Sequence, residues 1–289
     1  MATSTHTGTL LVPVANVETA ERLLHTAADI ATDNAYAISI VHVVEVPPSI
    51  PLSEGGRLVD DEEEAILERA RSMVEDEAES VPVETRTRLA RDIANGIVGA
   101  AEEQDAACVL MGWRGRPPRR DVVLGSYLDT VLRNAPCDVL VKRIRTPQAA
   151  VDSVLVPVAE GAHSEFAAET AGSIARRHDA SVSLVHVVPE EAPSDERDAG
   201  ADHLRRALSH LGEVPSVTQQ LIESDHVPGA ITDRSAEHDV TVVGATGEHV
   251  LRRKLLGTVS DAVGRNAAGT VILAKRHLST GSRLRRLLR

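Results

Sequence analysis

Four short sequence blocks occur twice in this chain of 289 residues, in the same order each time. Residues 10–14 read LLVPV and residues 154–158 read VLVPV, and VHVV occurs both at 41–44 and at 185–188. A glycine-rich block and a closing VLVKR or ILAKR block follow in both copies. Four matching blocks in one order indicate a duplicated domain. The sequence therefore predicts two copies of one unit, and the length is sufficient for two cores.

Within each copy, short Val/Ile/Leu-rich runs alternate with longer stretches of helical period. The runs predict strands at 9–15, 37–45, 83–89, 107–112 and 138–143, and then at 152–158, 181–188, 216–223, 239–244 and 270–275. The stretches between them predict helices near 17–32, 60–79, 92–104 and 125–134, and then near 162–178, 195–211, 228–237 and 257–266. Nearly continuous apolar strands that alternate with helices are typical of a parallel sheet covered on both faces. We therefore predict an α/β fold of two tandem, doubly wound open sheets with five parallel strands each.

The domain boundaries follow from the same comparison. We expect the first domain at 1–146, the second at 151–277 and a basic tail at 278–289, with Pro147 marking the linker. The first copy is longer, mostly because of a Pro/Gly/Ser-rich stretch after Val44 that reads as a loop leading into an acidic helix start. In that helix, the residues expected to share the buried side are Ala65, Ile66, Ala70, Met73 and Val74.

Composition narrows the classes of function. The formal net charge is −12, whereas a nucleic-acid-binding surface needs basic patches, so we expect no nucleic-acid partner. Basic residues are almost all arginines and aromatic residues are scarce, which is typical of a halophile or of a high-GC genome; the two readings stay open. No apolar run approaches the length of a membrane span and the first residues do not resemble a signal peptide, so we expect no membrane contact. Two cysteines are too few for a disulfide framework, which indicates a reducing, cytoplasmic setting.

Two cysteines and two matched histidines are candidates for chemistry. Cys108 and Cys137 are too few for a disulfide framework, and no metal-ligand cluster surrounds them, so we expect buried structural thiols. His42 and His186 occupy matching strands without partners at ligand spacing, so we expect them to be packed and hydrogen-bonded. No nucleophile–base pair or carboxylate pair emerges, and we assign no catalytic or metal-binding residue.

The pattern G-x2-G-x9-G-[ST] follows the fourth strand of both copies, at 112–126 and at 244–258. Glycine lets the backbone turn sharply and approach a ligand, so these turns can point N–H groups at phosphate oxygens. The closing Gly-Ser or Gly-Thr opens the next helix, where a hydroxyl can cap the helix and where free N–H groups favour an anion. Basic residues in the two loops could add charge-assisted contacts: Arg114, Arg116, Arg119, Arg120, Arg252, Arg253 and Lys254. Ordinary turn chemistry is the alternative, because glycine at strand ends and Ser or Thr at helix starts are common without a ligand.

Taken together, the strand ending in Pro-Val, the strand with His-Val, the glycine pattern and the final V-L-V-K-R strand resemble the ATP-binding branch of the universal stress protein family. The resemblance covers almost all of the chain, twice. It implies strand order 3-2-1-4-5 and ATP or AMP at the carboxyl edge of the sheet, with Mg²⁺ as a candidate companion ion. It also implies that the strands at 138–143 and 270–275 pair within the chain, as the final strands of two family domains pair in a dimer. Association of two whole chains is left open.

Carried over residue by residue, the resemblance implies two nucleotide sites. The first would be lined by Pro13, Val43, Met111, Gly112, Gly115, Gly125, Ser126 and Tyr127. The second would be lined by Pro157, Val187, Val243, Gly244, Gly247, Gly257, Thr258 and Val259.

The chain departs from the family at one polar position in each copy. The family usually has Asp two residues after the first-strand Pro, reaching the adenosine part of the ligand, and this chain has Ala15 and Ala159 there. Asn16 or Glu160 could stand in, but neighbouring strand residues point to opposite faces. We therefore expect weaker or altered adenine specificity. The second site should be the better one, because the first has Pro117-Pro118 in its loop and a bulky Tyr127 where the second has Val259.

Three hypotheses about function follow. The favoured one is a nucleotide-binding regulatory protein of the universal stress response. The second is an interaction module with vestigial sites, for example one associated with a transporter. The third is a slow ATPase, for which the sequence offers no water-activating group.

Overall fold

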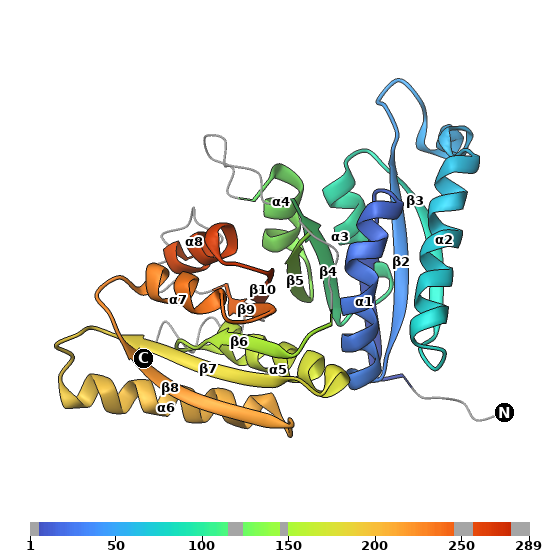
Figure 1. The fold of residues 1–289 in the computed structure, drawn as a ribbon. Helices are drawn as coiled ribbons and strands as arrows, with labels where there is room; N and C mark the ends of the chain where they lie inside the picture. Colours follow the sequence, from blue (N-terminus) through green and yellow to red (C-terminus); the bar gives the residue numbers. More distant parts are fainter. Residues whose placement is uncertain (1–5, 115–123, 145–149, 246–256, 279–289) are drawn as a thin grey trace.

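A single sheet of ten strands forms the centre of the computed structural model, which describes residues 6–114, 124–144, 150–245 and 257–278 (Figure 1). The first half contributes strands β1 (Gly8–Pro13), β2 (Tyr36–Glu45), β3 (Val83–Ala90), β4 (Cys108–Trp113) and β5 (Asp138–Arg143). Its helices are α1 (Val17–Asn34), η1 (Leu52–Leu58), α2 (Asp61–Glu77), α3 (Ile93–Glu103) and α4 (Ser126–Asn134).

The second half repeats this order of elements. Its strands are β6 (Ser153–Pro157), β7 (Ser181–Val188), β8 (Ser216–Glu223), β9 (Val240–Gly244) and β10 (Thr270–Lys275). Its helices are α5 (Ala162–His178), α6 (Ser194–Leu211), α7 (Val227–Ser235) and α8 (Thr258–Asn266). Every strand and α-helix predicted from the sequence is present within a few residues, as expected where hydrophobic periodicity is strong.

Strand order confirms the predicted fold. The sheet runs β3-β2-β1-β4-β5-β10-β9-β6-β7-β8, so each half has the order 3-2-1-4-5. All pairs within a half are parallel. The two halves join through β5 and β10, which pair antiparallel with Val141 opposite Leu273. The expected pairing of the final strands within the chain is therefore present, and Figure 1 shows it at the centre of the molecule.

Two apolar cores cover the two faces of this sheet. Successive strand residues point to opposite faces, so Leu10 and Val12 enter one core while Leu11 enters the other. Helices α1, α2, α5 and α6 contribute to the first core, and α3, α4, α7 and α8 contribute to the second. Each core contains residues of both halves, so the halves share their buried surface.

The insertion after Val44 differs in detail from the prediction. It contains the short 3₁₀ helix η1, in which the buried Gly55 lies against Val46 and Leu89. Helix α2 then begins with a capping box: Asp60 accepts from the first-turn backbone, and the Glu63 side chain accepts from the Asp60 N–H at 3.0 Å.

The prediction of the buried side of α2 was wrong at one residue. Ala65 is exposed, and Leu67, which the sequence reading left out, is buried. At about 100° per residue, the four buried residues of α2 share one side of the helix, and Ala65 lies on the opposite side.

Candidate nucleotide site

The first half contains a cavity of about 580 Å³ at the carboxyl edge of its sheet. Its walls come from the ends of β1, β2 and β4, from the start of α3 and from the start of α4. Parallel strands in this topology leave such a crevice where the chain leaves β1 and β4 in opposite directions. The volume lies within the range of pockets that bind small molecules and cofactors.

Most of the residues predicted for the first site line this cavity. They are Pro13, Val43, Met111, Gly112, Gly125 and Tyr127. Ser126 is exposed at the start of α4 and is not among the lining residues, and Gly115 lies outside the described residues. The structure therefore brings together six residues that are more than a hundred positions apart along the chain at their extremes.

Sequence reasoning missed several walls of the same cavity. Ile93 and Ile97 lie on the first two turns of α3, and Trp113 is the last residue of β4. The two isoleucines could have been found from their spacing of four, which places both on one face of a helix that begins at the carboxyl edge. Trp113 follows Gly112 directly, and nothing in its spacing distinguished a wall residue from a loop residue.

The glycines of the first site have different physical roles. Gly125 has φ of +142°, a backbone conformation that residues with a Cβ rarely adopt. Space is not the constraint, because a Cβ there would meet no atom within 4 Å. It is the N-cap of α4 and provides no side-chain cap, so the first-turn amides of α4 are not capped by it. The expectation that the hydroxyl residue caps the helix was wrong in both halves: Gly125 and Gly257 are the N-caps, and Ser126 and Thr258 are already helical.

The two matched histidines have structural hydrogen bonds, as expected. His42 Nδ1 lies 2.9 Å from the carbonyl oxygen of Val14, and His186 Nδ1 lies 2.7 Å from that of Val158. Each ring therefore ties the second strand of its half to the end of the first. The packed, hydrogen-bonded reading is confirmed for both, although His42 also forms part of the cavity wall.

Both cysteines are buried and free, as the composition suggested. Burial raises the pKa of the Cys137 thiol to about 12 and raises that of Cys108 well above its ordinary value. Thiols of this kind are protonated at neutral pH and react slowly, because the thiolate is the nucleophile. Among the described residues, no group of three or more His, Cys, Asp or Glu side chains could hold a metal ion.

Comparison with protein-family models now places the chain. The model described as the universal stress protein family matches it twice, over residues 6–143 and 150–275. The chain belongs to the universal stress protein family.

Relatives and solved structures fall into two groups. The Na⁺/H⁺ antiporter NhaS5 of Synechocystis is 24% identical over 279 residues, which are 92% of this chain but 38% of the antiporter, so the chain spans well under half of that relative. A universal stress protein structure from Archaeoglobus fulgidus matches 94% of this chain and 97% of its own, with a TM-score of 0.61 and 17% identity. The cytoplasmic domain of a prokaryotic cation chloride cotransporter matches 92% and 95%, with a TM-score of 0.61 and 12% identity. The two structural likenesses show a shared fold. Within the residues that the structure describes, none of the helices has the length and apolar character to cross a membrane.

The position where universal stress proteins usually carry Asp faces the cavity here. Ala15 is one of the lining residues. Its neighbour Asn16 does not replace a carboxylate at the cavity, because its side chain caps α1 by accepting from the Thr19 N–H at 2.8 Å. In the second half Glu160 is exposed, and the Ala159 N–H donates to Ser164 Oγ at 3.0 Å. The first site is therefore a mainly apolar cavity.

In the second half, the predicted site residues lie at matching places in the fold. Val187 and Val259 both pack against the second core, while Pro157, Val243 and Gly244 are buried. Gly257 and the exposed Thr258 begin α8, and Gly247 lies outside the described residues together with the rest of 246–256.

Gly244 has a packing role of its own. A Cβ at this position would lie 2.7–2.8 Å from backbone atoms of His163 and Ser164, at the start of α5. The carbonyl oxygen of Gly244 also accepts from Ser260 Oγ on α8 at 2.7 Å. Close helix packing therefore requires glycine here whether or not a ligand binds, and the relative quality of the two sites stays a prediction.

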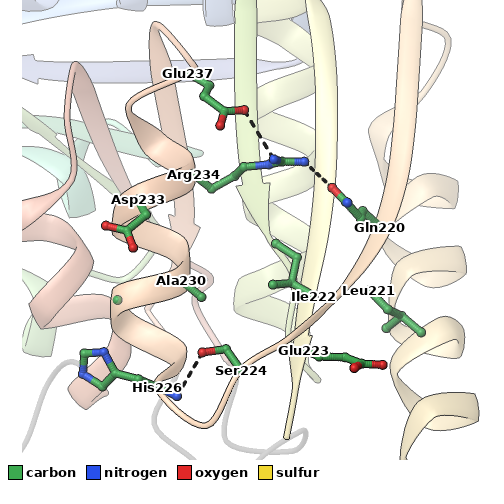
Figure 2. A pocket seen from close by; sticks show the side chains of 11 residues that line it. Gln220, Leu221, Ile222, Glu223, Ser224, His226, Ala230, Asp233, Arg234 and Glu237 are labelled. Atoms are coloured by element: carbon green, nitrogen blue, oxygen red, sulfur yellow. Dashed lines mark hydrogen bonds and ion pairs between the residues drawn. The ribbon is translucent and has the colours of Figure 1, made fainter. Parts of the chain in front are cut away.

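A second cavity, of about 630 Å³, lies between β8 and α7 in the second half (Figure 2). Figure 2 shows Arg234 between Gln220 and Glu237, with the Glu237 carboxylate 3.3 Å away. At the corresponding place of the first half, between β3 and α3, Arg88 on β3 lies against Gly99 of α3 and pairs with Glu103 at 2.5 and 2.9 Å. None of the residues predicted for the second nucleotide site lines this cavity.

Proposed function

We propose that this universal stress protein is a nucleotide-binding regulatory protein, with one site in each half for an adenine nucleotide such as ATP or AMP. The observation that carries the proposal is the cavity at the carboxyl edge of the first half, lined by six of the eight residues expected there. Its apolar walls suit a nucleobase and ribose, because small-molecule pockets combine apolar walls with a few placed polar groups.

The start of α4 suits the phosphates. Gly125 is at the cavity and leaves the first-turn amides of α4 without a side-chain cap. Helix N-termini bind anions because their free N–H groups and the helix dipole both favour negative charge. Arg114, half exposed at the cavity, adds a guanidinium that can approach a phosphate. Mg²⁺ would then be held mainly by the phosphates and water.

Calorimetry with ATP, AMP and cyclic AMP tests the proposal, together with thermal unfolding at the same concentrations. A ligand at 100 times its Kd stabilises the folded state by about 2.7 kcal/mol, so a clear rise in Tm is expected for at least one nucleotide. No heat of binding and an unchanged Tm with all three nucleotides at millimolar concentration would overturn the proposal.

Two matched variants assign the sites. Ile93→Trp places a large ring in the first cavity at the first residue of α3, and we expect it to remove one binding event. Val227→Trp makes the same change at the first residue of α7 in the second half and should remove the other. A protein that keeps full stoichiometry in both variants would place the nucleotides elsewhere.

The missing carboxylate offers a test by gain of function. Ala15→Asp places a carboxylate at the wall of the first cavity, where universal stress proteins usually carry one. We expect the affinity for an adenine nucleoside phosphate to rise at least about tenfold, because one charge-assisted hydrogen bond is worth about 1.5–3 kcal/mol. An affinity unchanged by Ala15→Asp, measured by calorimetry, would mean that the ligand lies differently in this cavity.

A regulatory module of a cation transporter is the second candidate, favoured by the likeness to an antiporter over 92% of this chain. The alanines at 15 and 159 agree with sites that have lost their ligand. In that case a cation/proton antiporter of the same organism would copurify with the chain, and copurification would survive both Ile93→Trp and Val227→Trp. Loss of the complex in these variants, or its dependence on nucleotide, favours the nucleotide-binding proposal instead.

A further inference from the structure

Trp113 belongs to two environments at once. It lines the cavity of the first half from the end of β4. Its ring also contacts α8 of the second half: a Cβ on Gly264 would lie 3.3 Å from the ring, and the Arg265 guanidinium lies 5.4 Å from its centre. Only 3% of Trp113 is exposed, so its ring is enclosed between the cavity and α8. A shift of the ring at the cavity wall would therefore also shift the surface on which α8 packs.

The indole N–H of Trp113 is a buried donor without a hydrogen-bond partner among the described residues. A buried donor without an acceptor is unfavourable. The matching residue of the second half is Ala245, which has neither a ring nor a side-chain donor. A tryptophan that joins the cavity to a helix of the other half is therefore present in the first half, and the matching position of the second half has none.

Helix α8 leads from Trp113 to the second site. It begins at Thr258, directly after Gly257, and its Ser260 Oγ donates to the carbonyl oxygen of Gly244 at 2.7 Å. Four of the residues predicted to bind the second nucleotide are thus associated with α8. Thr258 and Val259 are on the helix, Gly257 precedes it, and Gly244 is bonded to it. A displacement of the helix changes where its first-turn amides lie relative to Gly244.

The far end of α8 is held by the strand neighbour of Trp113. Arg143 lies opposite Trp113 in the β4–β5 ladder. Its guanidinium donates to the carbonyl oxygens of Gly264 and Arg265, at 3.0 and 3.2 Å, and to two more beyond the helix, those of residues 267 and 269, at 2.6 and 2.7 Å. The helix is therefore held against the first half by the ends of two adjacent strands.

We propose that Trp113 couples the two nucleotide sites: a ligand in the first cavity contacts the indole and, through α8, alters the affinity of the second site. This inference rests on the proposed function. It adds that the two sites affect each other's affinity and that Trp113 transmits the effect. Coupling between binding sites is reciprocal, so a ligand in the second site alters the affinity of the first by the same factor. The contacts form a continuous path from Trp113 at the cavity wall, through α8, to the start of that helix at the second site. The experiment measures whether the two sites are energetically coupled along it.

Hydrogen exchange of α8 tests the coupling in the Val227→Trp protein, in which the first cavity is the remaining site. ATP is added at saturation, and exchange is followed in the peptide that spans 258–266. We expect the rates to change about fivefold or more, the lower range of allosteric coupling. Trp113→Phe, which keeps a ring and loses the N–H, should retain part of the response, and Trp113→Ala should lose it. Calorimetry on the same samples reports how much ATP each variant binds.

Arg265→Met provides a variant outside the cavity. It removes the guanidinium over the indole and leaves every cavity residue in place, so we expect ATP to bind the first cavity within about twofold of the parent affinity with a weaker response in α8. If ATP binds and α8 exchanges equally with and without it, the coupling is wrong and the proposed function stands. If calorimetry detects no nucleotide in the parent protein, the proposed function fails and the coupling fails with it.

Discussion

At the scale of single residues, the closing Lys-Arg pair of the first half shows how one dipeptide serves both faces of the sheet. Successive strand residues point to opposite sides, so Lys142 and Arg143 leave β5 in opposite directions. Lys142 Nζ donates to Thr26 Oγ1 on α1 at 2.7 Å, and Arg143 reaches α8. Both side chains are buried, at 2% and 4% exposure, which is rare for cations and requires partners.

Removal of the Arg143 guanidinium should weaken the contact between the halves. Arg143→Met leaves four carbonyl oxygens at the end of α8 without their donor, and we expect a loss of about 3 kcal/mol in the free energy of unfolding. Urea unfolding measures the loss. Arg205→Met is the matched control, because Arg205 is exposed and pairs within its own helix, and its effect should stay within about 0.5 kcal/mol. Equal effects of the two substitutions would contradict this role of Arg143.

Lys142 should make the free energy of unfolding depend on pH in the alkaline range. Burial lowers its pKa from 10.5 to about 8, so the unfolded chain binds more protons than the folded chain between pH 8 and pH 10.5. Stability contributed by this group therefore rises with pH across that window, by about 3 kcal/mol. Urea unfolding of the wild type and of Lys142→Met, compared at pH 7.5 and 10.5, isolates the effect, since other titrating groups are common to both. Parallel pH profiles of the two proteins would contradict the assignment.

At the scale of elements, close helix packing depends on glycines whose neighbours are backbone atoms. Gly172 on α5 lies where a Cβ would be 2.1 Å from the carbonyl oxygen of Leu211, the last residue of α6. Backbone cannot rotate away as a side chain can, so α5 and α6 approach as closely as they do only with glycine here. Sequence periodicity predicted both helices and did not show that they touch at this residue.

Gly172→Ala should therefore separate α5 from α6. We expect a loss of about 2 kcal/mol, typical of an added methyl group in a packed interior. The control is Gly56→Ala in η1, where a Cβ meets no atom within 4 Å and where reduced entropy of the unfolded chain should make the change neutral or slightly stabilising. Thermal and urea unfolding of both variants test the pair, and a neutral Gly172→Ala would show that α6 can shift at little cost.

At the scale of the whole molecule, the ten-stranded sheet makes two sequence repeats into one structural unit. Strands β5 and β10 join without a break in hydrogen bonding, and both cores contain residues of both halves. Helices α1 and α5 also contact across the junction, where Arg176 pairs with Asp33 at 2.6 and 2.7 Å. An equivalent surface between separate chains would be an obligate interface, apolar and continuous with the cores.

We therefore expect the two halves to unfold together. The single tryptophan, Trp113, lies at the junction and reports on it by fluorescence, whereas far-UV circular dichroism reports on helices throughout the chain. Coincident urea transitions by the two probes are the expected result for one cooperative unit. Two separated transitions, with fluorescence changing first, would show that the junction opens before the halves unfold.

The sequence alone determined the repeat, the order of elements, the sheet topology implied by the family resemblance, and six residues of the first cavity. These features are local or periodic: apolar runs show strands, glycines show turns, and a duplicated pattern shows which turns match. Tertiary structure alone decided which side chains cross the junction. Trp113 and Arg143 reach α8 from more than a hundred positions away in sequence, and Asn16 is occupied with a helix cap. The pairing of a side chain with a distant partner depends on how two surfaces meet, and no spacing within either segment encodes that.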